Sequence, residues 1–365
     1  MTELDRRAIL GMSAALTGAA ALGSTAALAT SASPSATAVP AGAIALPARM
    51  IEPPRSISEA AQASLRKGAM VPYSPSPPAD DVAGWKASIA AHEAGMLKMM
   101  NGGDLVLPGF KVEDRIMGGV PVYVVTPPAS APNQGKPHMN IHGGGWTSLG
   151  GKLARVFAQV AAQAYGGIVY AVDYRRPPDH PYPAPLDDCL AVYRELVRLH
   201  APESILLAGG SAGSNLAAAM LHKARDTGLP RPGCLFLDTP IVDLRCIGDS
   251  LVTNQYLDTL LKVWSKDANV AVYARGADVE SPYLSPLLGD LGKGFPPTYL
   301  RTGTRDLFLS DTVRFHAALR KAGVEADLYV GEAMPHGGFG SRTPEDEDAR
   351  QDTLRWLARH WRVAT

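Results

Sequence analysis

The sequence predicts an α/β fold: a mostly parallel central sheet flanked by helices, with a helical cap. From residue 111 onward, short apolar runs alternate with amphipathic stretches of helical period. Continuous apolar strands separated by amphipathic helices are typical of a parallel sheet covered on both faces. Two segments, residues 39–105 and 246–280, do not follow this alternation. We expect them to form the cap over one edge of the sheet.

Each element follows from its pattern. Residues 111–118 and 120–128 look like a hairpin, and residues 137–144 like an apolar strand that ends in glycines. In residues 152–165 the apolar side chains recur at helical spacing. A further helical pattern covers residues 80–100. The remaining expected strands are 166–174, 204–210, 233–243, 297–306 and 325–334, and the remaining expected helices are 185–200, 214–228, 309–323 and 345–361.

Composition limits the class of protein. The chain has 365 residues, of which 46% are hydrophobic and 19% charged, as in a soluble globular protein with a large core. Lys and Arg number 35, as do Asp and Glu, so the formal net charge is zero. Nucleic acids and anionic membranes attract clustered positive charge, and we therefore expect neither as a partner. The expected partner is a small molecule. The sequence does not define the number of subunits, and a dimer is compatible with it.

The first residues have the pattern of an export signal. Arg6 and Arg7 precede a weakly apolar stretch, residues 8–22, and small-x-small sites follow before residue 39. This pattern resembles a bacterial twin-arginine signal. Ser, Thr and Gly interrupt the run, so a membrane anchor is disfavoured. We expect residues 1–38 to be signal and linker, the α/β core proper to be 106–245 and 281–365, and the mature protein to be periplasmic or secreted without stable membrane association.

The cysteines do not form a scaffold. Cys189, Cys234 and Cys246 are too few for a disulfide framework and lack the spacing of metal ligands. Buried thiols are the favoured interpretation. In an oxidising compartment a Cys234–Cys246 bridge is the alternative.

One serine lies in the sequence context of a nucleophile. Ser211 is the centre of Gly-Gly-Ser-Ala-Gly, between an expected strand and an expected helix. In a nucleophile elbow the serine occupies a strained strand-to-helix turn, where flanking glycines let the two backbones approach. The helix N-terminus behind it favours developing negative charge. Alone, the motif is equally compatible with a simple tight turn.

A second glycine motif supplies what a serine nucleophile needs. Gly143, Gly144 and Gly145 follow His142 at a strand-to-loop junction. Acyl transfer needs backbone N–H donors for the oxyanion of the tetrahedral intermediate, one of them from the residue after the nucleophile, here Ala212. The alternatives are a plain turn or a phosphate-binding loop, but the Lys-Ser/Thr or G-x-G-x-x-G spacing of a phosphate-binding loop is absent.

An acid and a base follow in the order that this chemistry requires. Asp306 comes at the very end of the segment 297–306, directly after its apolar strand residues, and His336 lies in the loop after the next strand. Ligand sites of open α/β sheets form at such strand ends. Neutral His336 would take the Ser211 proton, and Asp306 would fix its tautomer. Asp311, at the start of a helix, is the competing acid, and its position favours a role in the first helical turn.

The other titratable residues have ordinary interpretations. Glu332, late in a strand, is expected to be solvated or ion-paired, and the histidines outside the motifs are expected to be surface or packing residues: His180, His200, His222, His316 and His360. No His, Asp or Glu cluster has metal-ligand spacing, so we expect neither a metal nor another cofactor.

Taken together, the motifs resemble those of the hormone-sensitive-lipase-like family of α/β-hydrolases, the bacterial family IV esterases. The resemblance runs from about residue 105 to the end and includes, in order, HGGGW, VDYRRPPDHPYPAPLDDCLAVYREL, GGSAGSNLA, TPIVDL, SPLLGDL, GTRDLFLSD and MPHG. It implies the α/β-hydrolase fold, a Ser211–His336–Asp306 triad and an oxyanion hole at Gly143, Gly144, Gly145 and Ala212. It also implies a cap built from an N-terminal segment and an insertion.

The sequence departs from the family at two positions. Gly210 stands where the family usually has Asp, and Ser214 where it usually has Gly. We expect both to influence substrate preference. Trp146, beside the glycine loop, and Tyr256 and Trp264 in the insertion are further expected pocket residues, with core packing as the alternative.

The resulting hypothesis is a serine hydrolase that cleaves small to medium carboxylic esters through an acyl-enzyme. The alternatives are a lactone hydrolase, because the GTRDLFLSD region is similar to a lactone-opening subgroup, or an amidase or acyltransferase on the same triad. A non-catalytic ligand-binding protein on this scaffold is a remote alternative, because such a protein would be expected to lose the nucleophile or the base.

Overall fold

The computed structural model describes residues 43–44, 46–68, 75–340 and 343–362. The predicted export signal therefore lies outside the described residues. Within them, no helix combines the length and the apolar character that crossing a bilayer requires.

In the part of the chain that the structure describes, the sheet has eight strands in the order β1-β2-β4-β3-β5-β6-β7-β8. β1, β2 and β4 pair antiparallel, and all pairs from β4–β3 to β7–β8 are parallel. The predicted mostly parallel sheet is thus confirmed. The strands are β1 (Lys111–Met117), β2 (Val120–Thr126), β3 (Pro137–Ile141), β4 (Ile168–Val172), β5 (Leu206–Gly210), β6 (Cys234–Asp238), β7 (Thr298–Gly303) and β8 (Ala326–Gly331).

One strand ends earlier than predicted. The apolar pattern predicted a strand over 233–243, but β6 ends at Asp238. Thr239 has a positive φ of 44°, and Pro240 has no backbone N–H to give to a neighbouring strand. The chain therefore leaves the sheet at Thr239 and becomes a loop.

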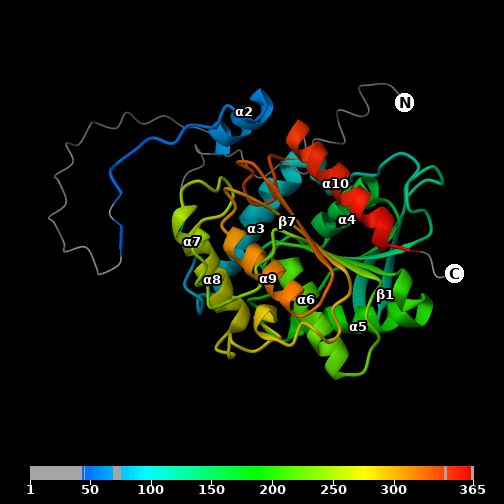
Figure 1. Cartoon of the computed structure of the whole chain (residues 1–365). Helices are drawn as coiled ribbons and strands as arrows, with labels where there is room; N and C mark the ends of the chain where they lie inside the picture. Colours follow the sequence, from blue (N-terminus) through cyan, green and yellow to red (C-terminus); the bar gives the residue numbers. More distant parts are fainter. Residues whose placement is uncertain (1–42, 45, 69–74, 341–342, 363–365) are drawn as a thin grey trace.

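Helices cover both faces of the sheet (Figure 1). Side chains of α5, α6 and α9 share one buried cluster with Leu207, Leu235 and Leu300 of the central strands. On the other face, α10 packs on β5, β6 and β7, and α4 packs on β2 and β4. Their bounds are α4 (Lys152–Tyr165), α5 (Ala184–Leu199), α6 (Ala212–Asp226), α9 (Leu309–Lys321) and α10 (Pro344–His360).

The segments outside the alternation also contain helices. The N-terminal segment, within residues 39–105, forms α2 (Glu59–Gly68) and α3 (Val82–Met99). The sequence pattern predicted α3 but not α2. Ser58, just before α2, donates to Glu345 of α10 through both its N–H and its hydroxyl group. α3 packs on α4 through Met96 and Leu153. The insertion forms α7 (Ser250–Thr253) and α8 (Val263–Ala274).

β5 and α6 meet at a corner without room for side chains. A Cβ atom on Gly209 would lie 2.3 Å from the Gly213 carbonyl oxygen, and one on Gly213 would lie 2.1 Å from the Ile141 oxygen. These contacts are with backbone atoms, which cannot rotate away. Gly210, between them in sequence, differs: its Cβ would meet nothing within 4 Å.

The two neighbouring glycines provide a matched test of this corner. Gly209→Ala will lower the free energy of unfolding by at least about 1 kcal/mol, because overpacking against backbone forces β5 and α6 apart. Gly210→Ala will change it by no more than about 0.5 kcal/mol. Urea unfolding followed by circular dichroism measures both, and equal losses would contradict this description of the corner.

Candidate active site

Ser211 lies in the β5–α6 corner with its backbone in the left-handed region, at φ 55° and ψ −121°. A residue with a Cβ adopts this conformation only where the surrounding structure enforces it. Here the Ser211 N–H donates to the Asp238 carbonyl oxygen at 2.8 Å, and α6 begins directly afterwards at Ala212. The hydroxyl group is therefore presented at the carboxyl edge of the sheet, beside a helix N-terminus that favours negative charge.

The structure brings the predicted base and acid to this hydroxyl group. His336, in the loop after β8, places Nε2 2.9 Å from Ser211 Oγ. Asp306, in the turn after β7, places Oδ1 3.0 Å from Nδ1 of the same ring. All three side chains thus form one hydrogen-bonded chain, although they come from three separate parts of the sequence.

Asp306 is itself held from two sides. Its Oδ1 accepts the Phe308 N–H at 2.9 Å, and its Oδ2 accepts the Thr302 hydroxyl at 2.7 Å. The carboxylate is fully buried, and the His336 ring is 4% exposed. Phe308 also packs edge-on against the imidazole, at 5.1 Å between centroids. These contacts fix both the carboxylate and the ring that it faces.

The pKa of His336 reflects two opposing influences. Burial disfavours the charged ring and lowers its pKa, but the nearby carboxylates outweigh burial, so the pKa is raised overall. Asp306 is the strongest of these carboxylates, and Asp258 and Asp238 add to it. An imidazolium formed in this site is therefore stabilised.

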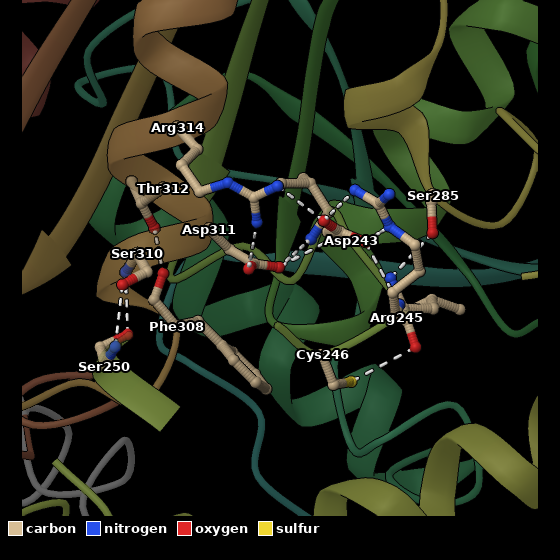
Figure 2. Close-up of polar contacts among 12 residues, drawn as sticks. Asp243, Arg245, Cys246, Ser250, Ser285, Phe308, Ser310, Asp311, Thr312 and Arg314 are labelled. Atoms are coloured by element: carbon tan, nitrogen blue, oxygen red, sulfur yellow. Dashed lines mark hydrogen bonds and ion pairs between the residues drawn. The ribbon is translucent and has the colours of Figure 1, made fainter. Parts of the chain in front are cut away.

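The competing acid faces another part of the molecule. Asp311 accepts the N–H groups of Val242 at 2.8 Å and Asp243 at 3.0 Å, in the loop after β6. Burial raises its pKa to about 6. Figure 2 shows Asp311 between this loop and Arg314. It lies in the first turn of α9, as predicted, and serves the neighbouring loop rather than the end of its own helix.

The remaining titratable residues lie in ordinary surroundings. Glu332 is exposed. Four histidines contact neighbouring groups away from Ser211: His200 the Tyr170 hydroxyl, His222 the Pro286 carbonyl, His316 the Ala326 carbonyl and His360 the Trp356 ring.

The glycine loop after β3 turns its carbonyl groups into the protein. The Tyr174 hydroxyl donates to the oxygens of His142 and Gly143, and the Ser148 N–H and hydroxyl donate to that of Gly144. Gly144 and Gly145 have positive φ of 92° and 59°, which glycine adopts without strain.

The loop's N–H groups are thereby left available. Across the ranges that the structure describes, no backbone acceptor engages the N–H groups of Gly144, Gly145 or Ala212. Gly143 approaches the nucleophile corner, where its Cβ would lie 3.2 Å from that of Ser211. The loop therefore offers free donors beside the serine.

A cavity of about 1160 Å³ opens over these groups. Trp146 lines it and stacks on Tyr273 of α8 at 4.6 Å. Gly210 also lines it and leaves space where a side chain would be. Both segments outside the alternation contribute walls to this cavity: Trp85, Ile89 and His92 from the first, and Leu260, Leu261 and Asn269 from the insertion.

Two expected pocket residues are not in the cavity. Ser214 is fully buried and donates to the Gly209 and Asp238 carbonyl oxygens, so it ties α6 to β5 and β6 instead. Tyr256 is 79% exposed and points to solvent. For both, the expected pocket role is wrong. The Trp264 side chain lies outside the described part of α8.

The cysteines are thiols. Cys189 and Cys234 are buried, and Cys246 donates to the Leu244 carbonyl oxygen at 3.4 Å. The alternative of a Cys234–Cys246 bridge is therefore wrong.

The site also contains two residues that none of the sequence motifs predicted. Asp258 of the insertion is buried beside Asp306 and His336, and one oxygen or ring nitrogen from each of the three lies within 4.8 Å of the other two. Asn269 closes over Gly145, where a Cβ would lie 2.4 Å from the Asn269 Nδ2 atom. Both residues lie in segments of irregular pattern, so only the three-dimensional contact reveals them.

The three-residue acidic group does not fit a metal. Both Asp258 oxygens accept hydrogen bonds from backbone N–H groups. The Asp306 oxygens accept hydrogen bonds from the Phe308 N–H and the Thr302 hydroxyl. Nδ1 of His336 faces Asp306 across a hydrogen bond. Most of the lone pairs that a cation would need are therefore already engaged.

Known proteins resemble this chain in sequence and structure. A profile of the alpha/beta hydrolase fold family matches residues 138–340. The chain is 35% identical to the carboxylesterase NlhH of Mycobacterium tuberculosis over 254 residues, 64% of this chain and 76% of that one. The crystal structure of esterase E25 superposes with a TM-score of 0.76 at 34% identity, covering 88% of this chain and 99% of that one. A second esterase, from the bacterial hormone-sensitive lipase family, superposes with a TM-score of 0.69 at 28% identity, covering 84% and 99%.

The chain therefore belongs to the hormone-sensitive-lipase-like branch of the α/β-hydrolases. It is a carboxylic ester hydrolase that acts on small-molecule esters, as its esterase relatives indicate.

The electrostatics of the site can be tested directly. Asp306→Asn will lower the pKa of His336 by about one to three units, because an adjacent negative charge is lost. Asp311→Asn is the matched control, since Asp311 bonds to the loop after β6 and not to His336. An NMR titration of the imidazole measures both, and an unchanged pKa in the Asp306 variant would contradict the described coupling.

Proposed function

We propose that Ser211 is the nucleophile, His336 the general base and acid, and Asp306 the residue that orients His336. The observation that carries the proposal is the hydrogen-bonded chain, 2.9 Å from Ser211 Oγ to His336 Nε2 and 3.0 Å from His336 Nδ1 to Asp306. This is the arrangement through which a serine hydroxyl is activated for acyl transfer.

In the first half of the reaction, Ser211 Oγ bonds to the ester carbonyl carbon while His336 Nε2 takes its proton. The carbonyl oxygen becomes an oxyanion and accepts hydrogen bonds from the N–H groups of Gly144, Gly145 and Ala212. The bond to the leaving oxygen then breaks, and His336 gives that oxygen its proton. The products are an alcohol and an acyl-enzyme.

The second half repeats these steps with water. His336 takes a proton from water, whose oxygen bonds to the acyl carbon. The bond to Ser211 Oγ then breaks, and the proton returns from His336 to the serine. A carboxylic acid leaves, and the site regains its starting state.

We further propose that residues 39–105 and 246–280 act as a cap that shapes the substrate. The walls that both segments give to the cavity support this role. A covered cavity favours small to medium soluble esters. Lactones, amides and acyl transfer use the same triad, so a panel of these substrates on the purified mature protein decides among them.

Export by the twin-arginine pattern of residues 1–38 stays a prediction, which cell fractionation tests.

Replacing the nucleophile tests the proposal. Ser211→Ala will reduce kcat for a short p-nitrophenyl ester by about 10⁶-fold, because no covalent intermediate can form. Ser214→Ala, three residues along the same helix, is the matched control and should keep most activity. If the Ser211 variant turned over the ester at a rate comparable to that of the wild-type protein, with an unchanged circular dichroism spectrum, the assignment would be overturned.

Replacing each candidate acid tests the other end of the chain. Asp306→Asn will lower kcat by up to about 10⁴-fold, because the amide favours the wrong tautomer of His336. Asp311→Asn should lower kcat far less, since Asp311 bonds to the loop after β6. The reverse order would transfer the role to Asp311.

The pH profile follows from the raised pKa of His336. Only neutral imidazole can accept the Ser211 proton, so kcat/KM will fall as the pH drops through this pKa. Because the carboxylates raise the pKa, the acidic limb should lie above the position expected for a free histidine. A profile without an acidic limb would exclude His336 as the base.

A further inference from the structure

The insertion supplies a buried carboxylate that the proposed mechanism does not use. Asp258 is 0% exposed and follows α7 in the chain. Its carboxylate lies within 4.8 Å of those atoms of Asp306 and His336 that could bind a ligand. It does not line the cavity, so it cannot touch the substrate.

This one carboxylate joins two segments that are distant in sequence. Its Oδ1 atom accepts the N–H groups of Leu260 at 2.8 Å and Leu261 at 3.0 Å, and both leucines line the cavity. Its Oδ2 atom accepts the N–H of Leu307 at 2.9 Å. Leu307 directly follows Asp306. The same side chain therefore fixes a wall of the cavity and the turn that carries the proposed acid.

The charges around His336 can be named element by element. Asp306 lies after β7, Asp258 in the insertion and Asp238 at the end of β6. The Asp238 charge is paired with Arg301, whose Nη2 is 2.6 Å away. Lys262 donates to the Asp258 backbone oxygen at 2.7 Å, and its ammonium group also interacts electrostatically with the Asp258 carboxylate. Three backbone N–H groups donate directly to the Asp258 carboxylate.

We propose that Asp258 is a positioning residue of the active site. It holds the Asp306 turn and the Leu260–Leu261 wall in one fixed arrangement, and it places a second negative charge near His336 that stabilises the imidazolium. The inference rests on the proposed function for its kinetic consequence, but its structural part does not. Burial and the neighbouring Asp306 raise the pKa of Asp258 to about 6, so this second charge is present at neutral pH and is lost in acid.

Asp258→Asn separates these contributions from a general loss of stability. A neutral amide has one accepting oxygen and turns an NH₂ group toward backbone N–H donors, so at least one of the two segments loses its anchor. We expect kcat/KM to fall by at least about 10-fold, with both a lower kcat and a higher KM. The acidic limb of the pH profile should move down by about one unit, because a nearby negative charge is lost.

Asp243→Asn is the matched control. Asp243 is likewise 0% exposed, and it bonds to Arg245 and Arg314 in the cluster of Figure 2. Its charge is paired with these two arginines, and it is not among the main influences on the pKa of His336. This variant should lose stability but keep the wild-type position of the acidic limb. If the Asp258→Asn protein cannot be purified, Asp258→Ser removes the charge without introducing an amide.

An NMR titration of His336 in the same variants reads its pKa without turnover. A lower pKa in the Asp258 variants, but not in the Asp243 control, supports the proposal. An unchanged pKa and an unmoved acidic limb in a folded Asp258 variant would overturn it. If the pKa falls as expected but the wild-type protein hydrolyses no ester, the proposed function fails while the positioning role of Asp258 holds.

Discussion

The close contact between β5 and α6 is the constraint on which the geometry of the site depends. Gly209 lets β5 approach α6, and Gly213 lets α6 approach the end of β3, to distances that any side chain would prevent. Ser211 is thereby held at φ 55°, with its hydroxyl at the edge of the sheet and the N-terminus of α6 behind it. Such strain persists only where the surrounding structure enforces it. Here the rigid sheet enforces it, and the strands of the same sheet lead into the turns that carry His336 and Asp306.

The parallel sheet brings the other groups to the same edge. Parallel strands end at one side, so the loops after β3, β7 and β8 meet around the end of β5. The glycine loop, Asp306 and His336 arrive there from distant parts of the chain. Buried neighbours then set their properties: carboxylates raise the pKa of His336 against the effect of burial. A network of separate hydrogen bonds holds the glycine-loop carbonyls away from the cavity.

Sequence reasoning succeeds where pattern and position are local. The β5–α6 corner is predictable because a continuous apolar strand, small residues and an amphipathic helix follow one another directly. Asp306 and His336 are predictable because each comes just after a strand in a parallel sheet. The sequence pattern does not predict α2, because this short helix lies in a Pro- and Ala-rich region. The predicted strand at 233–243 is longer than β6, because apolar residues continue past Asp238 into a loop.

Side-chain direction is the part that sequence patterns do not contain. Ser214 and Gly210 flank the same serine, yet one hydroxyl points into the sheet while the other position opens into the cavity. Tyr256 and Asp258 are two residues apart in the insertion. One is 79% exposed and the other is fully buried beside His336. Only the packing of the insertion on the turn after β7 decides which of them belongs to the site.

Covalent labelling tests the central claim, that Ser211 is the activated nucleophile, most directly. The native protein would be treated with a serine-reactive phosphonate, and the modified peptide would be identified by mass spectrometry. The described geometry predicts one adduct, on Ser211, and no adduct on the folded His336→Ala variant in the same time, because the base that activates the hydroxyl is gone. Labelling at another serine of the native protein, or equally fast labelling without His336, would contradict it.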